Sequence, residues 1–202
     1  MTGRSSQQSV AEMKPLAHDS LLIHGIMIGK RILLRAPEPG DLEVLYAWEN
    51  DPSVWQISNT LTPFSRYTLE QYILSSQLDI HSSRQLRLMI DLITPAGAGR
   101  PVGTIDLFDY DPLHRRAGIG ILINKADRGY GYASEALELL IDYAFNTLQL
   151  HQLYCTISAD NEKSLKLFQE HRFKIAGLKK EWLSVKNKWK DEYLLQRINE
   201  SQ

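Results

Sequence analysis

Hydrophobic positions along the chain change their spacing several times, and each spacing predicts a different element. The apolar run at residues 31–35 is bounded by arginines and followed by proline and glycine, which predicts a strand and then a turn. Asp41 stands at a helix N-cap position, and the apolar stripe after it predicts a helix that Asp51-Pro52 ends. The segment starting at Thr68 fits a capping box and predicts a second helix to about Gln77.

From Gln85 to Ile123 the apolar period shortens to two, which predicts β-structure. One strand is predicted at residues 85–91, a second at 101–108 and a third at 116–123, with residues 94–101 as the loop between the first two. Short connections of this kind join antiparallel neighbours. We therefore expect an antiparallel meander.

The last third of the chain alternates helices and strands. Apolar residues between Ala133 and Leu148 recur every three or four positions, which predicts a long amphipathic helix. A strand at 152–157, a helix at 161–171 and strands at 181–185 and 192–198 follow. This order predicts a mixed α/β fold, with a mostly antiparallel central sheet flanked by helices.

Composition limits the class of protein. With 202 residues, 43% of them hydrophobic, the chain suits one compact domain. Residues 1–20 are rich in serine and glutamine without an apolar period, so we expect a flexible tail there and a single domain at 21–202.

Charge and cysteine content limit the partners and the compartment. The formal net charge is −1, which offers no bulk attraction for nucleic acid or an anionic membrane. Cys155 is the single cysteine, and no apolar run approaches the roughly 18 residues that span a bilayer. We expect a cytoplasmic protein without a disulfide.

A glycine-rich segment between the third strand of the meander and the long helix carries the strongest chemical signal. Its residues are Arg128, Gly129, Tyr130, Gly131, Tyr132 and Ala133. A turn of this kind at a helix N-terminus presents free backbone N–H groups and the positive end of the helix dipole, which suits a phosphate. The chain lacks the Gly-Lys-Ser/Thr of a P-loop, and Gly118-Ile119-Gly120 lacks the third glycine of a dinucleotide fingerprint. An ordinary turn remains the alternative.

Three motifs resemble one known family, the GCN5-related N-acetyltransferases (GNAT). Arg128-x-x-Gly131-x-Ala133 after residues 120–124 is similar to its acyl-CoA pyrophosphate motif, and Asn161-Glu162-Lys163-Ser164 to its second motif. Leu34-Arg35 with Pro39-Gly40-Asp41-Leu42 resembles the opening of the branch that holds spermidine and ribosomal-protein N-terminal acetyltransferases. The resemblance covers about residues 28–198.

The resemblance implies the GNAT fold, acetyl-CoA as cosubstrate and transfer of its acetyl group to a primary amine by direct attack in a ternary complex. It implies that acetyl-CoA lies between the strand ending at Ile123 and the strand near Cys155. The implied contacts of acetyl-CoA are Ile121, Leu122, Ile123, Arg128, Gly129, Tyr130, Gly131, Tyr132, Ala133, Asn161, Ser164 and Phe168. It also implies a homo-oligomer.

The chain departs from the family pattern at catalytic positions. The tyrosine that usually protonates the thiolate falls at Phe168, which has no proton to give, and the glutamate often found on the third meander strand falls at Gly118. Solvent, Tyr132 or Tyr154 could supply the proton instead. An acyl-CoA-binding protein with little catalysis is therefore a competing hypothesis.

Candidate acceptor residues are few. Asp106 and Asp109 lie on or after the second meander strand, where a carboxylate could bind an ammonium ion, and Asp106 is also the candidate catalytic group. Trp55 could line the acceptor pocket. Residues 55–60 lack the acidic pair that the resemblance to spermidine enzymes implies, so the acceptor is a polyamine, a smaller amine or a peptide N-terminus. No two histidines have the spacing of metal ligands, so no metal is expected.

Overall fold

The structure is a computed structural model that describes residues 22–23, 26–53, 55, 62–76 and 79–200. The tail expected at residues 1–20 lies outside these described residues. No helix in the described ranges is long and apolar enough to cross a membrane.

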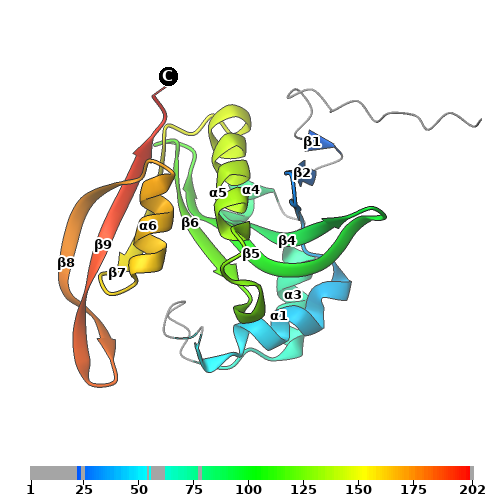
Figure 1. Cartoon of the computed structure of the whole chain (residues 1–202), viewed down its shortest axis with the longest axis horizontal. Helices are drawn as coiled ribbons and strands as arrows, with labels where there is room; N and C mark the ends of the chain where they lie inside the picture. Colours follow the sequence, from blue (N-terminus) through cyan, green and yellow to red (C-terminus); the bar gives the residue numbers. More distant parts are fainter. Residues whose placement is uncertain (1–21, 24–25, 54, 56–61, 77–78, 201–202) are drawn as a thin grey trace, which may run out of the picture.

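The described strands form one sheet in the order β1-β2-β3-β4-β5-β6-β7-β9-β8 (Figure 1). Neighbouring strands are antiparallel except β6 and β7, which are parallel. The predicted mixed, mostly antiparallel sheet is therefore confirmed. The strands are β1 (Leu22–Ile23), β2 (Ile26–Ile28), β3 (Ile32–Arg35), β4 (Leu86–Thr94), β5 (Gly97–Asp111), β6 (Arg116–Ile123), β7 (Gln152–Ser158), β8 (Lys174–Val185) and β9 (Lys188–Ile198).

Helices cover both faces of this sheet (Figure 1). The helices are α1 (Leu42–Glu49), α3 (Arg66–Ser75), α4 (Ile80–Ser83), α5 (Tyr132–Asp142) and α6 (Glu162–Glu170). A π-helical turn, Tyr143–Thr147, continues α5, so the predicted long helix is confirmed. On one face α5 and α6 contribute to the main core, and on the other α1 and α3 enclose a small cluster of Leu45, Ile73 and Met89.

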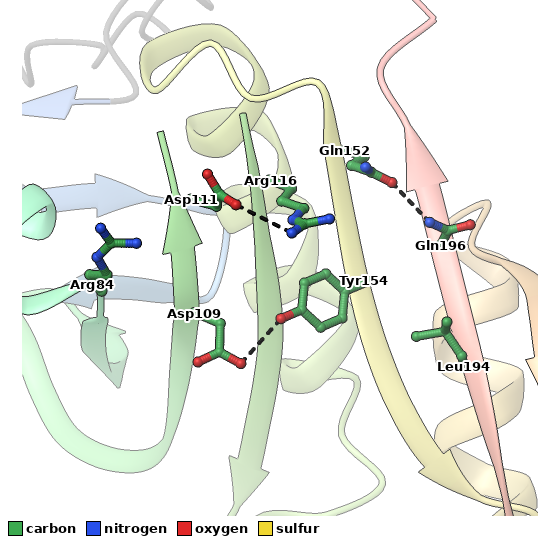
Figure 2. Close-up of a pocket in the computed structure, with 8 residues that line it drawn as sticks. All are labelled: Arg84, Asp109, Asp111, Arg116, Gln152, Tyr154, Leu194 and Gln196. Carbon is green, nitrogen blue, oxygen red and sulfur yellow. Dashed lines mark hydrogen bonds and ion pairs between the residues drawn. The ribbon is translucent and has the colours of Figure 1, made fainter. Parts of the chain in front are cut away.

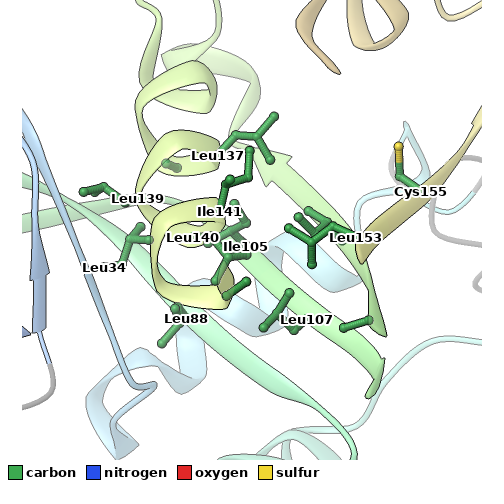
Figure 3. Packing of buried hydrophobic residues seen from close by; sticks show 14 of the residues in the cluster. Leu34, Leu88, Ile105, Leu107, Leu137, Leu139, Leu140, Ile141, Leu153 and Cys155 are labelled. Atoms are coloured by element: carbon green, nitrogen blue, oxygen red, sulfur yellow. The ribbon is translucent and has the colours of Figure 1, made fainter. Parts of the chain in front are cut away.

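The main core forms where the apolar stripe of α5 meets the inward side chains of the strands (Figure 3). Leu137 and Leu140 of the helix, and Ile105 and Leu107 of β5, have no exposed surface. Burying one such side chain contributes roughly 1.5–3 kcal/mol relative to exposure. The packing of α5 on the sheet therefore fixes the position of the loop that joins β6 to α5.

Several predicted boundaries are wrong. Residue Thr68 does not cap α3; Ser65 does, because its side chain accepts a hydrogen bond from the Thr68 N–H at 3.0 Å. The predicted loop at 94–101 is mostly strand, since Gly97 already pairs with Thr94. Strands β8 and β9 are also longer than predicted, and α4 was not predicted.

Asp41 occupies the predicted N-cap position of α1, but its carboxylate has another task. It accepts hydrogen bonds from the Arg35 guanidinium at 2.7 and 2.9 Å and from the Glu38 N–H at 2.8 Å. Arg35 also bonds buried Asp91 of β4 at 2.6 Å. The Arg35…Asp41 segment therefore fastens the entry of α1 to the sheet.

Candidate active site

Strands β6 and β7 run side by side for only part of their length. Their register pairs Arg116 with Gln152, Ala117 with Leu153 and Gly118 with Tyr154, and pairing stops there. Beyond this point β6 continues to Ile123 and β7 to Ser158. The loop before α5 follows the end of β6, and the loop before α6 follows the end of β7. The two loops singled out in the sequence therefore lie at the end of the sheet where β6 and β7 are no longer paired.

The glycine-rich loop after β6 has the conformation that its sequence predicts. Gly129 and Gly131 have φ values of 88° and 82°, in the left-handed region that favours glycine. Gly131 is the N-cap of α5 and makes no side-chain cap, so no side chain occupies the helix N-terminus as a cap. Arg128 donates from Nε to the Ile123 carbonyl at 2.9 Å, which ties the loop back to the end of β6.

Arg31 reaches this loop from the start of β3. Its Nη1 donates to the Tyr130 carbonyl at 2.7 Å, and a Cβ placed on Gly131 would lie 3.2 Å from its Nη2. Glu135 on α5 holds Arg31, because its carboxylate accepts from the Arg31 Nε at 2.9 Å and from the Lys30 and Arg31 backbone N–H groups at 2.6 and 2.8 Å. A second cation therefore stands beside the glycine loop.

The second motif forms the N-terminus of α6. Asn161 is the N-cap, and its Oδ1 accepts from the Ser164 N–H at 3.2 Å. Asparagine at this position satisfies one of the N–H groups that a helix start leaves unpaired. The motif residues Asn161 and Ser164 thus bond to each other.

A cavity of about 540 Å³ opens over the paired ends of β6 and β7 (Figure 2). Its lining residues come from β5, β6, β7, β9 and the residue after α4: Arg84, Asp109, Asp111, Arg116, Gln152, Tyr154, Leu194 and Gln196. The Tyr154 hydroxyl donates to Asp109 at 3.2 Å, and Arg116 pairs with Asp111 at 3.3 Å. Burial, followed by the neighbouring Asp109 charge, raises the pKa of Tyr154, so its hydroxyl keeps its proton at neutral pH.

The cavity lies on the α1 side of the sheet. Phe108, Gly118 and Tyr154 are directly opposite one another in register and share one face. Asp106, two residues before Phe108, is on this face too and belongs to a cluster that includes Glu49 of α1. The glycine loop leads instead into α5, which packs on the opposite face. Groups from the two faces can therefore meet only where β6 and β7 separate.

Comparison with known proteins identifies the family. A family model described as an acetyltransferase (GNAT) domain matches residues 31–174. The chain belongs to this GNAT family. It is an acetyltransferase of the GNAT type, and acetyl-CoA is the acyl donor that the family uses.

Two curated relatives and one solved structure show how close the similarity is. The chain is 28% identical to the N-acetyltransferase p20 of Bacillus licheniformis over 82% of this chain and 91% of the relative. It is 27% identical to spermidine N(1)-acetyltransferase of Escherichia coli strain K12, over 72% and 74%. Spermidine N-acetyltransferase of Vibrio cholerae, solved with CoA and spermine, matches with a TM-score of 0.74 at 23% identity, over 83% of this chain and 95% of that one. This last likeness confirms the GNAT fold.

The structure shows what occupies the space beside Gly118, the position at which the family resemblance implied a glutamate. A Cβ placed on Gly118 would lie 2.3 Å from Cε2 of Phe108, so the Phe108 ring occupies that space. The ring also contacts Tyr154 edge-on, with centroids 5.9 Å apart. A carboxylate cannot stand at position 118 while Phe108 is there.

Phe168 lies in the main core. It is 3% exposed and packs edge-on against Phe173 with centroids 5.1 Å apart. Its side chain offers no proton. Tyr132, the first alternative donor, has its ring beside Arg31 and Tyr130 at the glycine loop. Tyr154 is the alternative donor that faces the cavity.

Asp106 forms an ion pair with Arg87, which the sequence did not indicate. Arg87 donates from Nε to Asp106 at 2.5 Å and from Nη1 to Glu49 of α1 at 2.6 Å. One guanidinium thus faces two carboxylates, and the cluster keeps one net negative charge. Arg87 also lies over the ring of Tyr72, 5.1 Å from its centroid, and burial raises the pKa of that tyrosine to about 12.

The remaining sequence candidates are Trp55, Cys155 and a metal site. Trp55 is half-buried and donates from Nε1 to the Glu49 carbonyl at 2.7 Å, and it does not line the described cavity. Residues 56–60 lie outside the described residues. Cys155 is buried, which raises the pKa of its thiol to about 12 and keeps it uncharged. Among the described residues, no group of three His, Cys, Asp or Glu side chains could hold a metal ion.

Proposed function

We propose that the protein transfers the acetyl group of acetyl-CoA to the primary amine of a small molecule by direct attack. The observation that carries this proposal is the separation of β6 from β7 beyond Gly118 and Tyr154, with the glycine loop on one side and the Asn161 motif on the other. The spermidine acetyltransferases named above support an amine acceptor of the polyamine or smaller kind.

The donor side of this site is built from backbone groups and two arginines. The pyrophosphate would bind the N–H groups of residues 128–133, with Arg128 and Arg31 as cations. The pantetheine arm would pair with the β6 backbone at Ile121 and Ile123, and Asn161 and Ser164 would flank it from the start of α6. Phe168, predicted as a further contact, is buried in the main core. Backbone N–H groups of β6 would then stabilise the oxyanion that forms at the thioester carbonyl.

The acceptor side needs a place for the amine proton and a proton for the leaving thiolate. The amine nitrogen forms a bond to the carbonyl carbon, the carbon–sulfur bond breaks, and the sulfur takes up a proton. We assign the donated proton to the Tyr154 hydroxyl, which faces the cavity and stays protonated. The Asp109 carboxylate beside it receives the proton that the amine loses.

Asp106 has a supporting role in this proposal. Because Arg87 already neutralises part of its charge, it is less suited than Asp109 to bind the amine directly. The net negative charge of the Arg87, Asp106 and Glu49 cluster would still attract a cationic acceptor toward this face of the sheet.

The first experiment combines CoA calorimetry with detection of free thiol. Thiol release from acetyl-CoA in the presence of a small amine is the expected result. Release with short N-terminal peptides alone would favour a peptide N-terminal acetyltransferase. Binding of CoA without release would favour a cofactor-binding protein with little catalysis, and neither binding nor release would overturn the proposal.

The donor site is tested by a charge placed in the glycine loop. Gly129→Glu should weaken CoA binding more than tenfold, because a carboxylate would stand against the pyrophosphate. Gly97→Glu is the matched control: both glycines have positive φ and open space around the Cβ position, but Gly97 is the first residue of β5, after the β4–β5 turn. Equal affinities in the two variants would contradict the assigned loop.

The protein is also proposed to work as a homo-oligomer. Spermidine N-acetyltransferase of Vibrio cholerae has a structure described as dodecameric, which supports this expectation.

A further inference from the structure

The cavity over β6 and β7 carries charges of both signs. Asp109 and Asp111 line it together with Arg84 and Arg116, and Tyr154 and two carboxamides complete its polar lining. Its volume of about 540 Å³ is in the range of small-molecule sites. A site for a polycation would be expected to present carboxylates without guanidinium groups beside them.

Two of these charged residues are held in an uncommon backbone conformation. Arg84 has φ 53° and Asp109 has φ 50°, both in the left-handed region that residues with a side chain seldom adopt. Asp109 stands where the register between β5 and β6 shifts, between Phe108 and Asp111. The Tyr110 N–H donates to the Arg84 carbonyl at 3.0 Å, so the two strained positions are coupled. Such strain persists where the surrounding structure directs a side chain to one place.

The charges of the cavity are not all paired. Arg116 and Asp111 satisfy each other at 3.3 Å, and Asp109 accepts one hydrogen bond from Tyr154. Within the described part of the chain, the Arg84 guanidinium makes no hydrogen bond or ion pair. Figure 2 shows Arg84 on the other side of Asp109 from Tyr154. The Asp109 carboxylate can therefore accept further hydrogen bonds, and the Arg84 guanidinium can bind an anion, in the same cavity.

We propose that the acceptor is a small amine that also carries a carboxylate, with its ammonium group on Asp109 and its carboxylate on Arg84. This inference rests on the proposed function, because it names the acceptor class of the same site. The ammonium group first loses one proton to solvent, and the neutral amine nitrogen then bonds to the acetyl carbon while the carbon–sulfur bond breaks. One proton of the attacking nitrogen passes to Asp109 and the sulfur takes a proton from Tyr154. Transfer of a proton from Asp109 to Tyr154 along their hydrogen bond restores both groups. The products are CoA thiol and an N-acetylated acid.

Acceptors that differ only in the carboxylate test the inference. Lysine is cadaverine with one added carboxylate, and ornithine is putrescine with one added carboxylate. A charge-assisted hydrogen bond contributes about 1.5–3 kcal/mol, which corresponds to roughly a 10- to 100-fold higher kcat/KM for each amino acid than for its diamine. Thiol release from acetyl-CoA gives these values.

Variants of Arg84 assign the preference to one side chain. Arg84→Gln should remove the preference for the amino acids over their diamines, whereas Arg84→Lys should restore part of it. Arg172→Gln is the matched control, since Arg172 also has a positive φ of 63° but does not line this cavity. It should keep the full preference.

The outcomes separate this inference from the proposed function. Diamines used as well as their amino acids, or a preference that survives Arg84→Gln, would overturn the inference while leaving the acetyltransferase intact. Equal use of amino-acid amides and free amino acids would also overturn it, and would point to a peptide N-terminus. Thiol release with none of the amines would overturn both.

Discussion

Single residues decide what this site cannot contain. The glycine at position 118 is required because the Phe108 ring covers it, and the same ring contacts Tyr154 at the cavity. An aromatic side chain of β5 therefore fills the space in which a side chain at position 118 would lie. In the proposed function the charge that meets the acceptor belongs to Asp109, which stands at the register shift after Phe108.

Gly118→Ala should lower the free energy of unfolding by about 1–3 kcal/mol, because the added methyl group overlaps the Phe108 ring. Gly120→Ala is the control on the same strand and face, since its nearest neighbours would be 3.8 Å or more from the new Cβ. Urea unfolding of both variants measures the difference. In the double variant Gly118→Ala with Phe108→Ala, the two costs should not add, and full additivity would contradict the overlap.

Residue roles were predictable where they depend on local spacing. Gly129 and Gly131 at the start of an amphipathic helix indicated their backbone conformation and their loop. Arg31 and Arg87 were not predicted, because each acts through a partner far along the chain: Arg31 meets Glu135, 104 residues away. Arg84 was not predicted because only the fold brings it into one cavity with Asp109. No local pattern encodes such a pairing, which the register of the sheet creates.

At the scale of elements, Glu135 joins the turn between β2 and β3 to the first turn of α5. Three hydrogen bonds from Lys30 and Arg31 reach its carboxylate. Burial alone would raise the pKa of Glu135, but the hydrogen bonds from Arg31 and Lys30 outweigh it and lower the pKa. The charged carboxylate therefore stabilises the fold at neutral pH.

Glu135→Gln should lower the free energy of unfolding by about 1–2 kcal/mol at pH 7, where the charged hydrogen bonds are complete. A lowered folded-state pKa gives stability that is full above the ordinary value of about 4.3 and is lost as the pH falls through the folded-state value. The difference from the unsubstituted protein should therefore shrink at pH 3. Thermal unfolding at both pH values checks this, with exposed Glu138→Gln on the same helix as the control. A difference that is as large at pH 3 would contradict it.

Element types were more predictable than their ends. The period of two in β4, β5 and β6 and the period near 3.6 in α5 are direct results of burying one side of each element. The length of β5 could not be read in the same way, because Gly97 joins the ladder by pairing with Thr94 and not by burying a side chain. Similarly, α3 begins at Arg66, three residues before its first buried residue, Leu69, so the apolar pattern did not indicate the start of the helix or its cap, Ser65.

For the whole molecule, the sheet ends in the hairpin of β8 and β9. Trp182 and Trp189 on this hairpin are 59% and 64% exposed, and β8 is an outer strand of the sheet. Large exposed aromatic groups beside an open strand edge are typical of surfaces that bind another chain.

Light scattering during gel filtration should therefore give a mass that is a multiple of 23.1 kDa. Replacing Trp182 and Trp189 together by serine should reduce the oligomer if this hairpin contributes to the interface. Tyr67→Ser on α3, where the side chain is 71% exposed, is the control and should not change the mass. A monomer mass for the unsubstituted protein at all concentrations would contradict the expectation.

The short pairing between β6 and β7 also divides the sheet mechanically. Strands β1 to β6 form one continuous ladder, β7 to β9 form another, and three residue pairs connect the two. The glycine loop follows a strand of the first ladder and Asn161 follows a strand of the second. A ligand that binds both would therefore add a second link between the two parts of the sheet. When CoA binds, amide hydrogen exchange should then slow in β6 and in β7 together, because the bound ligand limits the movement of the two groups of strands relative to each other.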